Sequence, residues 1–140
     1  MWVIKGVYKG AAAAKLPVEG TNYTLDQIID QSKGNGSCVW AGDWLGINAS
    51  HPGAQPFYDS LIQTLASWQI DFVKVDCIFG HSSKGLLPDI SMITKAIRKV
   101  PRPIALSLSP GGGIHPSDAA QVAMPSDEAG PLATMYRVSE

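Results

Sequence analysis

The sequence predicts an α/β protein whose parallel strands alternate with helices. Three apolar segments, 1–7, 70–76 and 103–109, have the length and composition of strands. Segments 57–68 and 86–100 lie between them and place apolar residues at helical spacing. Strands that alternate with helices in this way are typical of βαβ units, which form parallel sheets with right-handed crossovers. We therefore expect one parallel sheet with helices packed against it.

The predicted helices have recognisable starts and apolar faces. Thr24 and Gln27 have the spacing of a capping box, which predicts a helix over residues 25–31. The helix over 57–68 is expected to face the core through apolar residues three to four positions apart. These residues are Phe57, Leu61, Leu65 and Trp68. The core face of the helix over 86–100 is expected to contain Ile90, Ile93 and Ile97.

The remaining segments connect these elements. Residues 34–56 contain Gly, Asn and Pro throughout and are expected to form a loop. After the third strand we expect a short helix at 115–123 and the start of a further strand at 135–138. A complete (β/α)₈ barrel needs about 250 residues. The whole chain, 1–140, therefore resembles the middle of one larger domain.

The composition excludes several classes of protein. With 45% apolar and 16% charged residues the chain is globular. A net charge of −1 gives no electrostatic reason to expect nucleic acid or an anionic membrane as a partner. No apolar run is long enough to span a bilayer. The three histidines, His51, His81 and His115, are isolated and no CxxC is present, so we expect neither a metal site nor a cofactor.

Two charged residues near the end of the second strand, Lys74 and Asp76, are the leading candidates for chemistry. Residues two apart on a strand point to the same face, and a buried strand seldom carries unpaired charges. The carboxyl ends of parallel strands are where α/β proteins place their active sites. Asp76 is therefore a candidate nucleophile or metal ligand, or else a carboxylate that caps the next segment. Lys74 would keep that carboxylate ionised or form a structural ion pair, and a Schiff-base role is disfavoured by the neighbouring carboxylate.

Other polar and aromatic residues lie in the predicted loops. Trp40, Asp43 and Trp44 could form a platform on which a sugar stacks, or they could hold the loop to the core. Arg137 could donate hydrogen bonds to hydroxyl groups, or it could be a solvated arginine. The glycine-rich stretch after Ser109 matches no phosphate-binding motif, which favours a simple strand-to-helix turn.

The cysteines and glycosylation sequons bear on the compartment. Cys38 and Cys77 are expected at the same rim of the sheet, where they could form a disulfide or remain free thiols. Three N-x-[ST] sequons, at Asn22, Asn35 and Asn48, favour the secretory route. No signal peptide is visible in the chain, which argues against that route unless the natural protein begins elsewhere.

The segment WQIDFVKVDC resembles the strand-four motif W-G-[IV]-D-[FYL]-[LVI]-K-x-D of the α-galactosidase (melibiase) glycoside hydrolases. Gln69 replaces the usual glycine of that motif. The segments CVWAGDWLG, PIALSLSPG and MYRVSE are similar to the preceding loop, strand five and strand six of the family. The pattern resembles plant melibiase-like members most closely. This resemblance implies a partial (β/α)₈ barrel that contains strands three to six.

The resemblance also implies roles for particular residues. Asp76 matches the catalytic nucleophile of these retaining enzymes, and Lys74 and Arg137 match residues that bind sugar hydroxyls. Trp40, Asp43 and Ser109 are expected to contact the sugar as well. The general acid/base of the pair would follow directly after Glu140. The resemblance associates Cys38 and Cys77 with a family disulfide, although the family cysteine usually lies two residues after the nucleophile.

The expected substrate is a terminal α-D-galactosyl group or a β-L-arabinopyranosyl group. Leu108, Ser109 and Pro110 replace the Cys-Glu-Trp type of sequence of many α-galactosidases, which favours a sugar without the exocyclic CH₂OH. The parent protein is expected to be extracellular or in the cell wall, vacuole or lysosome. Without the general acid/base, we expect this chain to be inactive by itself. A non-catalytic product that binds sugar weakly is the alternative, and the oligomeric state is open.

Overall fold

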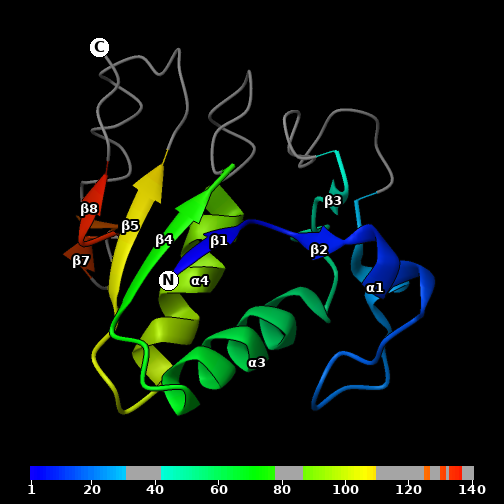
Figure 1. Cartoon of the computed structure of the whole chain (residues 1–140), viewed down its shortest axis with the longest axis horizontal. Helices are drawn as coiled ribbons and strands as arrows, with labels where there is room; N and C mark the ends of the chain where they lie inside the picture. The colour runs from blue at the N-terminus through cyan, green and yellow to red at the C-terminus, as the bar shows by residue number, and fades with distance from the viewer. Residues whose placement is uncertain (31–41, 78–86, 110–124, 127–129, 132, 137–140) are drawn as a thin grey trace.

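The computed structural model describes residues 1–30, 42–77, 87–109, 125–126, 130–131 and 133–136. The main sheet contains four parallel strands, in the order β1-β4-β5-β8, at the left in Figure 1. The strands are β1 (Trp2–Ile4), β4 (Phe72–Asp76), β5 (Ala105–Ser109) and β8 (Met135–Tyr136). The predicted parallel α/β arrangement is confirmed, whereas the closure of these strands into a barrel stays a prediction.

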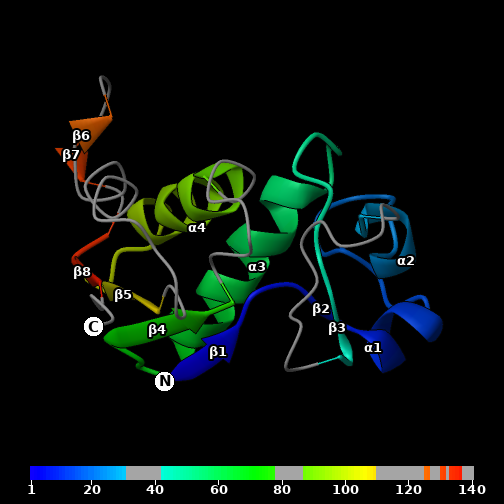
Figure 2. The same ribbon diagram turned by 90° about the horizontal axis from the view of Figure 1, so that it is seen from above.

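Two long helices cover one face of this sheet. Helices α3 (Ala54–Ser67) and α4 (Leu87–Lys99) both lie on the same side of the strands (Figure 2). Apolar side chains of the two central strands point to the helices and are almost fully buried. They are Val73, Val75, Leu106 and Leu108. Burial of such a side chain stabilises the fold by about 1.5–3 kcal/mol, so the sheet is held mainly from its helical side.

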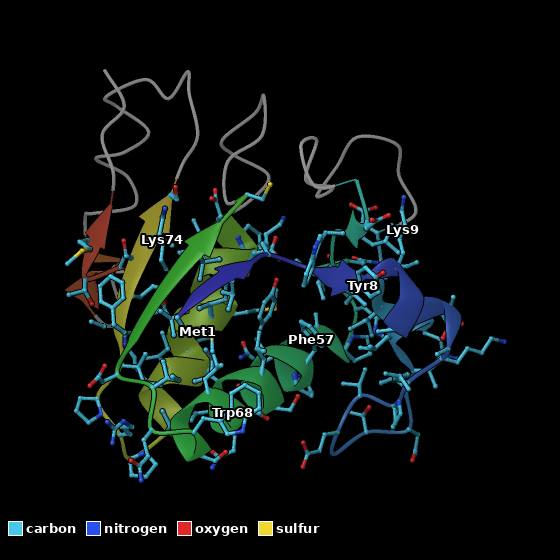
Figure 3. The ribbon with its side chains drawn as sticks, viewed as in Figure 1. Met1, Tyr8, Lys9, Phe57, Trp68 and Lys74 are labelled. Atoms are coloured by element: carbon cyan, nitrogen blue, oxygen red, sulfur yellow. The ribbon has the colours of Figure 1, made fainter. Side chains whose placement is uncertain are left out.

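The core face of α3 agrees with the predicted one in part, because Leu65 is buried and Phe57 and Leu61 pack against the core. The buried residues are Ala54, Tyr58, Ile62 and Leu65. The prediction that Trp68 lies in the core is wrong, because this residue is 63% exposed. Trp68 follows the last turn of the helix, at the end of the molecule opposite to the carboxyl ends of the strands (Figure 3). Tyr58 takes the central position because its hydroxyl group finds a buried partner on α4, as described below.

The expected core face of α4 is largely correct. Ile90 and Ile93 are buried and Ile97 is half-buried against the core. Two further residues of the same helix, Met92 and Ala96, complete the buried surface.

A smaller group of elements lies beside the sheet, at the right in Figure 1. It contains α1 (Lys9–Ala13), α2 (Leu25–Ile28) and the antiparallel strands β2 (Val7–Tyr8) and β3 (Trp44–Leu45). The predicted capping box is present, since the Gln27 side-chain oxygen accepts the Thr24 main-chain N–H at 3.0 Å. The helix is shorter than predicted because Ile29 adopts an extended conformation and bridges to Ile47.

The predicted first strand, 1–7, is divided into β1 and β2. Gly6 separates them with a φ of +108°, a conformation that side chains rarely adopt. A Cβ atom at this position would overlap the carbonyl oxygen of Leu45, so glycine is required here. Strand β3 lies inside the segment predicted as a loop, because it pairs with β2.

Near the other end of the described chain, β6 (Pro125–Ser126) and β7 (Gly130–Pro131) form a short antiparallel pair that was not predicted. The helix expected at 115–123 lies outside the described residues. Within the described ranges, no helix combines the length and the apolar character that crossing a membrane requires.

Candidate active site

The side chains of β4 alternate between two environments. Val73 and Val75 are buried against the helices, whereas Lys74 and Asp76 are partly exposed. Because neighbouring side chains on a strand point to opposite faces, Lys74 and Asp76 share the face that α3 and α4 do not cover. Figure 3 shows Lys74 on the sheet. The prediction that the two charges lie on one face is therefore confirmed.

The register of the sheet extends this polar face to its neighbours. Lys74 is opposite Ser107 of β5, and Asp76 is opposite Ser109. Residues opposite each other in a parallel pair lie on the same face, so two serines join the two charged residues in one polar group. Ser107 and Ser109 are 9% and 1% exposed. The sugar contact expected of Ser109 therefore stays a prediction for a side chain that is covered in this structure.

The Asp76 carboxylate is held by the residue that follows it. Its Oδ1 atom accepts the main-chain N–H of Cys77 at 2.8 Å. Cys77 has a φ of 59°, in the left-handed region that is unfavourable for a side chain with a Cβ atom. Backbone strain of this kind costs of order 1–3 kcal/mol and is concentrated at functional sites. The carboxyl end of β4 thus has the local geometry of a site at which one carboxylate is oriented.

The main chain of Asp76 is also held from the neighbouring strand. The N–H of Lys5, just after the end of β1, donates to the carbonyl oxygen of Asp76 at 3.1 Å. β1 therefore extends its pairing with β4 up to the candidate nucleophile.

The structural ion pair considered for Lys74 is not observed. Three ion pairs join residues that the structure describes, and Lys74 takes part in none of them. Among the described residues, the ammonium group of Lys74 is therefore not paired with the Asp76 carboxylate.

Two further predicted site residues, Asp43 and Trp44, lie at the β2–β3 pair. Asp43 is exposed, and its main-chain carbonyl accepts the N–H of Lys9 at 2.8 Å beside the β2–β3 pair. Trp44 packs against Tyr8 with ring centroids 6.1 Å apart, which supports a role in holding this pair together. Trp40 and Arg137 lie outside the described residues, so their roles stay predictions.

The predicted disulfide joins Cys77, which the structure describes, to Cys38. No free cysteine occurs among the described residues. Cys38 lies outside the described residues, so its pairing with Cys77 stays a prediction.

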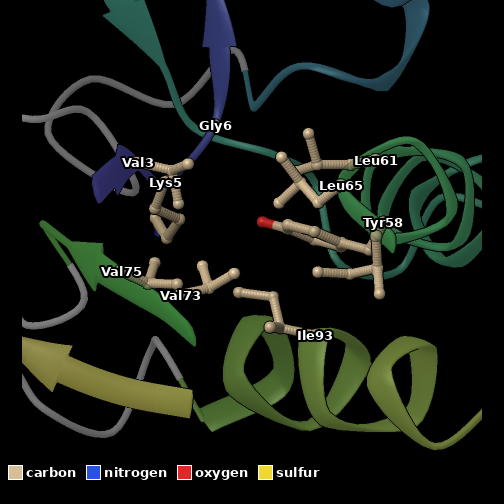
Figure 4. A pocket seen from close by; sticks show the side chains of 10 residues that line it. Val3, Lys5, Gly6, Tyr58, Leu61, Leu65, Val73, Val75 and Ile93 are labelled. Carbon is tan, nitrogen blue, oxygen red and sulfur yellow. The ribbon is translucent and has the colours of Figure 1, made fainter. Parts of the chain in front are cut away.

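A buried group of polar residues was missed by the sequence reasoning. Lys5, Asp89 and Tyr58 meet between β1, α3 and α4, and all three are buried. The available signal was a lysine in the apolar run MWVIKGV, which is the same kind of signal that indicated Lys74. Lys5 and Tyr58 line a cavity of only about 10 Å³, shown in Figure 4. Since one water molecule needs about that volume, the cavity cannot hold a sugar.

The described part of the chain can also be compared with the requirements of a metal site and of a larger ligand pocket. No group of three or more potential metal ligands occurs among these residues. An open pocket of about 620 Å³ lies near Pro101 and Thr134. It contains none of the predicted site residues, and its residue Asp71 lies just before β4, whereas Asp76 ends that strand.

Comparison with known proteins gave matches only among solved structures. No protein-family model matches the chain, and no curated protein matches it. A GH27 β-L-arabinopyranosidase from Geobacillus stearothermophilus is similar with a TM-score of 0.81 and 36% sequence identity. The match covers 97% of this chain and 29% of that enzyme, so the chain spans less than a third of the enzyme's length. A variant of the same enzyme in complex with arabinose matches equally well.

A second protein gives a similar result. A candidate α-N-acetylgalactosaminidase from Bacillus halodurans matches with a TM-score of 0.71 and 36% identity over 80% of this chain and 25% of its own. Both organisms are bacteria, so the plant melibiase-like subgroup suggested by the sequence is not supported by these matches. The chain is thus similar over 97% of its length to a GH27 glycosidase, which supports a protein of the glycoside hydrolase type.

Proposed function

We propose that this chain forms part of the active-site barrel of a retaining glycoside hydrolase, with Asp76 as the nucleophile. The observation that carries the proposal is the position of Asp76. It ends a central parallel strand, it faces the side of the sheet that the helices leave uncovered, and its carboxylate is oriented by the Cys77 N–H at 2.8 Å. The 36% identity to a GH27 glycosidase over 97% of the chain supports the same role.

In this proposal the chemistry of Asp76 is nucleophilic attack on a sugar. One carboxylate oxygen attacks the anomeric carbon, the bond to the leaving oxygen breaks, and a glycosyl-Asp76 ester forms. Water then hydrolyses the ester, which restores the carboxylate and the original anomeric configuration. A retaining enzyme needs a second carboxylate about 5–5.5 Å from the first. We assign that second role to none of the described residues.

Lys74 and the neighbouring serines have a binding role in this proposal. Lys74 lies two residues before Asp76 on the same face and takes part in none of the ion pairs between described residues. An ammonium group donates up to three hydrogen bonds, which suits the recognition of sugar hydroxyls. Trp40, Asp43, Ser109 and Arg137 are proposed as further sugar contacts on the strength of the sequence resemblance.

The proposed substrate is a terminal β-L-arabinopyranosyl group, with α-D-galactosyl as the close alternative. The two sugars share their ring hydroxyl pattern and differ by the exocyclic CH₂OH. The similar Geobacillus enzyme is a β-L-arabinopyranosidase, and its variant is described in complex with arabinose. We propose the secretory route for the parent protein, on the basis of the exposed sequons at Asn22 and Asn48.

A non-catalytic sugar-binding protein is the second candidate. The observation that favours it is coverage, because the chain corresponds to 29% of the similar enzyme. A retaining glycosidase needs both carboxylates and the closed pocket around them. Sugar binding without turnover by this chain would support the second candidate.

The test compares this chain with a chimera, in which residues 1–140 replace the matching 29% of the Geobacillus enzyme. Both proteins are assayed with nitrophenyl β-L-arabinopyranoside and α-D-galactopyranoside. We expect the chimera to hydrolyse the arabinoside faster, and Asp76→Asn to lower its rate by about 10³-fold or more. The matched control is Asp71→Asn just before the same strand; its side chain is 77% exposed and, among the described residues, pairs with Arg102 at 3.7 Å. Equal rates for the two variants would refute the role of Asp76.

A further inference from the structure

A buried ion pair lies behind the carboxyl end of β4. The Nζ atom of Lys5 is 3.3 Å from Oδ2 of Asp89, and the two side chains are 1% and 3% exposed. Val3 and Lys5 are two residues apart and both line the helix-side cavity with Val75 (Figure 4). The ammonium group is therefore directed to the helices and away from the face that carries Asp76.

Tyr58 completes the group from α3. Its hydroxyl donates to Oδ1 of Asp89 at 2.6 Å, so each carboxylate oxygen has one partner. Figure 4 shows the Tyr58 ring pointing into the space between β1, β4 and α4, with its hydroxyl toward Lys5. Burial, and then the charge and hydrogen bond of Asp89, raise the pKa of Tyr58 well above its usual value. Tyr58 thus remains a donor across the neutral range.

Stability alone does not explain why charges occupy this position. Burying an ion pair costs desolvation energy, and replacing such pairs by apolar residues is often neutral or stabilising. The cavity here is too small to hold a ligand. A buried pair can instead fix one arrangement of the segments that carry it, and the segments here meet at Asp76.

Lys5 connects the ion pair to the candidate nucleophile through its main chain. Its side chain binds α4, while its own N–H donates to the carbonyl oxygen of Asp76 at 3.1 Å. The next residue, Gly6, lies against the carbonyl of Leu45 and cannot be moved closer. The backbone of Lys5 is thus held on three sides. The carbonyl that it binds belongs to the residue whose carboxylate accepts the Cys77 N–H.

We propose that Lys5 and Asp89 are positioning residues for Asp76. Their ion pair holds the Lys5 main chain on the carbonyl of Asp76 and thereby fixes the orientation of the Asp76 carboxylate. This inference rests on the proposed function where it concerns catalysis, because a misplacement of about 1 Å can lower the rate of a reaction about 10²-fold. The structural link between the ion pair and Asp76 can be tested without any activity.

The first test measures amide hydrogen exchange by NMR in the unmodified chain and in Lys5→Met. We expect exchange at the Lys5 and Cys77 positions to rise about tenfold or more relative to Leu106, because the local bonds open while the sheet centre stays paired. The control is Lys99→Met, which removes a lysine from the exposed ion pair with Asp59 and should leave the ratio unchanged. If the exchange rates at positions 5 and 77 of Lys5→Met, relative to that of Leu106, stay within about twofold of those in the unmodified chain, the proposal is overturned.

A second variant keeps the test valid if Lys5→Met fails to fold. Tyr58→Phe preserves the ring and removes only the hydroxyl that holds Asp89. We expect a smaller change of the same kind, about threefold at Cys77, because the ion pair loses one of its supports. An unchanged Cys77 ratio in a folded Tyr58→Phe protein would also overturn the proposal.

The catalytic consequence is measured by covalent labelling of Asp76 in the chimera, with a difluorinated galactoside that carries a trinitrophenolate leaving group. An Asp76 oxygen bonds to the anomeric carbon, and trinitrophenolate leaves with the electron pair of the broken bond. For Lys5→Met we expect the limiting labelling rate to fall about tenfold, with half-saturation changed by less than about threefold. Lys5→Arg should restore most of the rate. A merely structural role would lower the folded fraction and leave the rate per folded molecule unchanged.

Hydrogen exchange tests the positioning link between Lys5 and Asp76, whereas covalent labelling tests the role of Asp76 as nucleophile. If the unmodified protein is not labelled but the exchange at Cys77 responds to Lys5→Met, the proposed function fails and the positioning link stands. If Asp76 is labelled and the exchange ratios do not respond, the proposed function stands and the positioning role is refuted.

Discussion

The carboxylate of Asp76 accepts the main-chain N–H of Cys77 at 2.8 Å, and Cys77 is in the left-handed region with a φ of 59°. The N–H of Cys77 belongs to the peptide group that joins it to Asp76, so the bond is made within this peptide unit, and the positive φ of Cys77 turns the chain that follows. A hydrogen bond to the adjacent main chain therefore contributes to the orientation of the carboxylate. This hydrogen bond does not depend on an ion pair with Lys74, which none of the described ion pairs includes.

Gln69 occupies a position that favours glycine. It follows α3 with a φ of 63°, as is usual for the residue that ends a helix in a left-handed turn. We expect Gln69→Gly to raise the free energy of unfolding by about 1 kcal/mol. The matched control is Gln63→Gly at an exposed position within α3, which should lower it by about 1 kcal/mol. Chemical denaturation measures both, and changes of the same sign would contradict this account of the turn.

A comparison of Gly6 with Gly20 distinguishes the cost of steric overlap from the cost of backbone strain. Both have positive φ values, but only at Gly6 would a Cβ atom overlap a backbone oxygen, that of Leu45. We expect Gly6→Ala to destabilise the protein by about 3 kcal/mol or more, and Gly20→Ala by about 1 kcal/mol. Thermal unfolding of the two variants provides the comparison. Equal losses would mean that the β2–β3 pair moves easily away from β1.

The raised pKa of Tyr58 predicts that the free energy of unfolding falls at alkaline pH. Its pKa is raised well above 10.0, mainly by burial and then by Asp89. Below about pH 10 the residue is protonated in both states, so the contribution is fully present. Above that, the unfolded chain releases a proton that the folded chain retains, and the stability falls by up to about 1.4 kcal/mol per pH unit.

We expect Tyr58→Phe to remove this part of the pH dependence. At pH 8 the variant should be less stable by about 1–3 kcal/mol, because one Asp89 oxygen loses its donor. Between pH 9 and 11 its stability should decrease less steeply than that of the unmodified protein. Urea unfolding at these pH values measures the difference, and parallel curves would show that Tyr58 does not control it.

Lys74 is expected to contribute to binding. We expect Lys74→Met in the chimera to raise the Michaelis constant for the aryl arabinoside about tenfold, because a donor to sugar hydroxyls is lost. The control is Lys95→Met on the exposed side of α4. If both variants behave alike, Lys74 is not a sugar contact.

The sequence predicted the central part of the fold because its signals are local. The strand that carries Lys74 and Asp76 could be assigned from an apolar run and its period of two. The helix before it was also found, and its core face was predicted correctly except for Trp68. Apolar spacing alone placed Trp68 in the core. In the structure Trp68 is exposed and Tyr58 is buried instead, because the Tyr58 hydroxyl binds Asp89.

The contacts around the site were beyond local reasoning because they join distant residues. Lys5 and Asp89 are 84 positions apart, and Tyr58 and Asp89 are 31 apart. The strain at Cys77 was also not visible in the sequence, because nothing in the residue type requires a positive φ. The strain at Gln69 left a trace, since the family motif has glycine at that position.

The central claim is that Asp76 is the nucleophile, and the most direct measurement is to identify the residue that becomes covalently bound to the sugar. The chimera is treated with the difluorinated galactoside, digested, and analysed by mass spectrometry. The account predicts one labelled peptide, with the sugar on Asp76, and no label in the Asp76→Ala variant. A label on another carboxylate, or labelling that persists in Asp76→Ala, would contradict it.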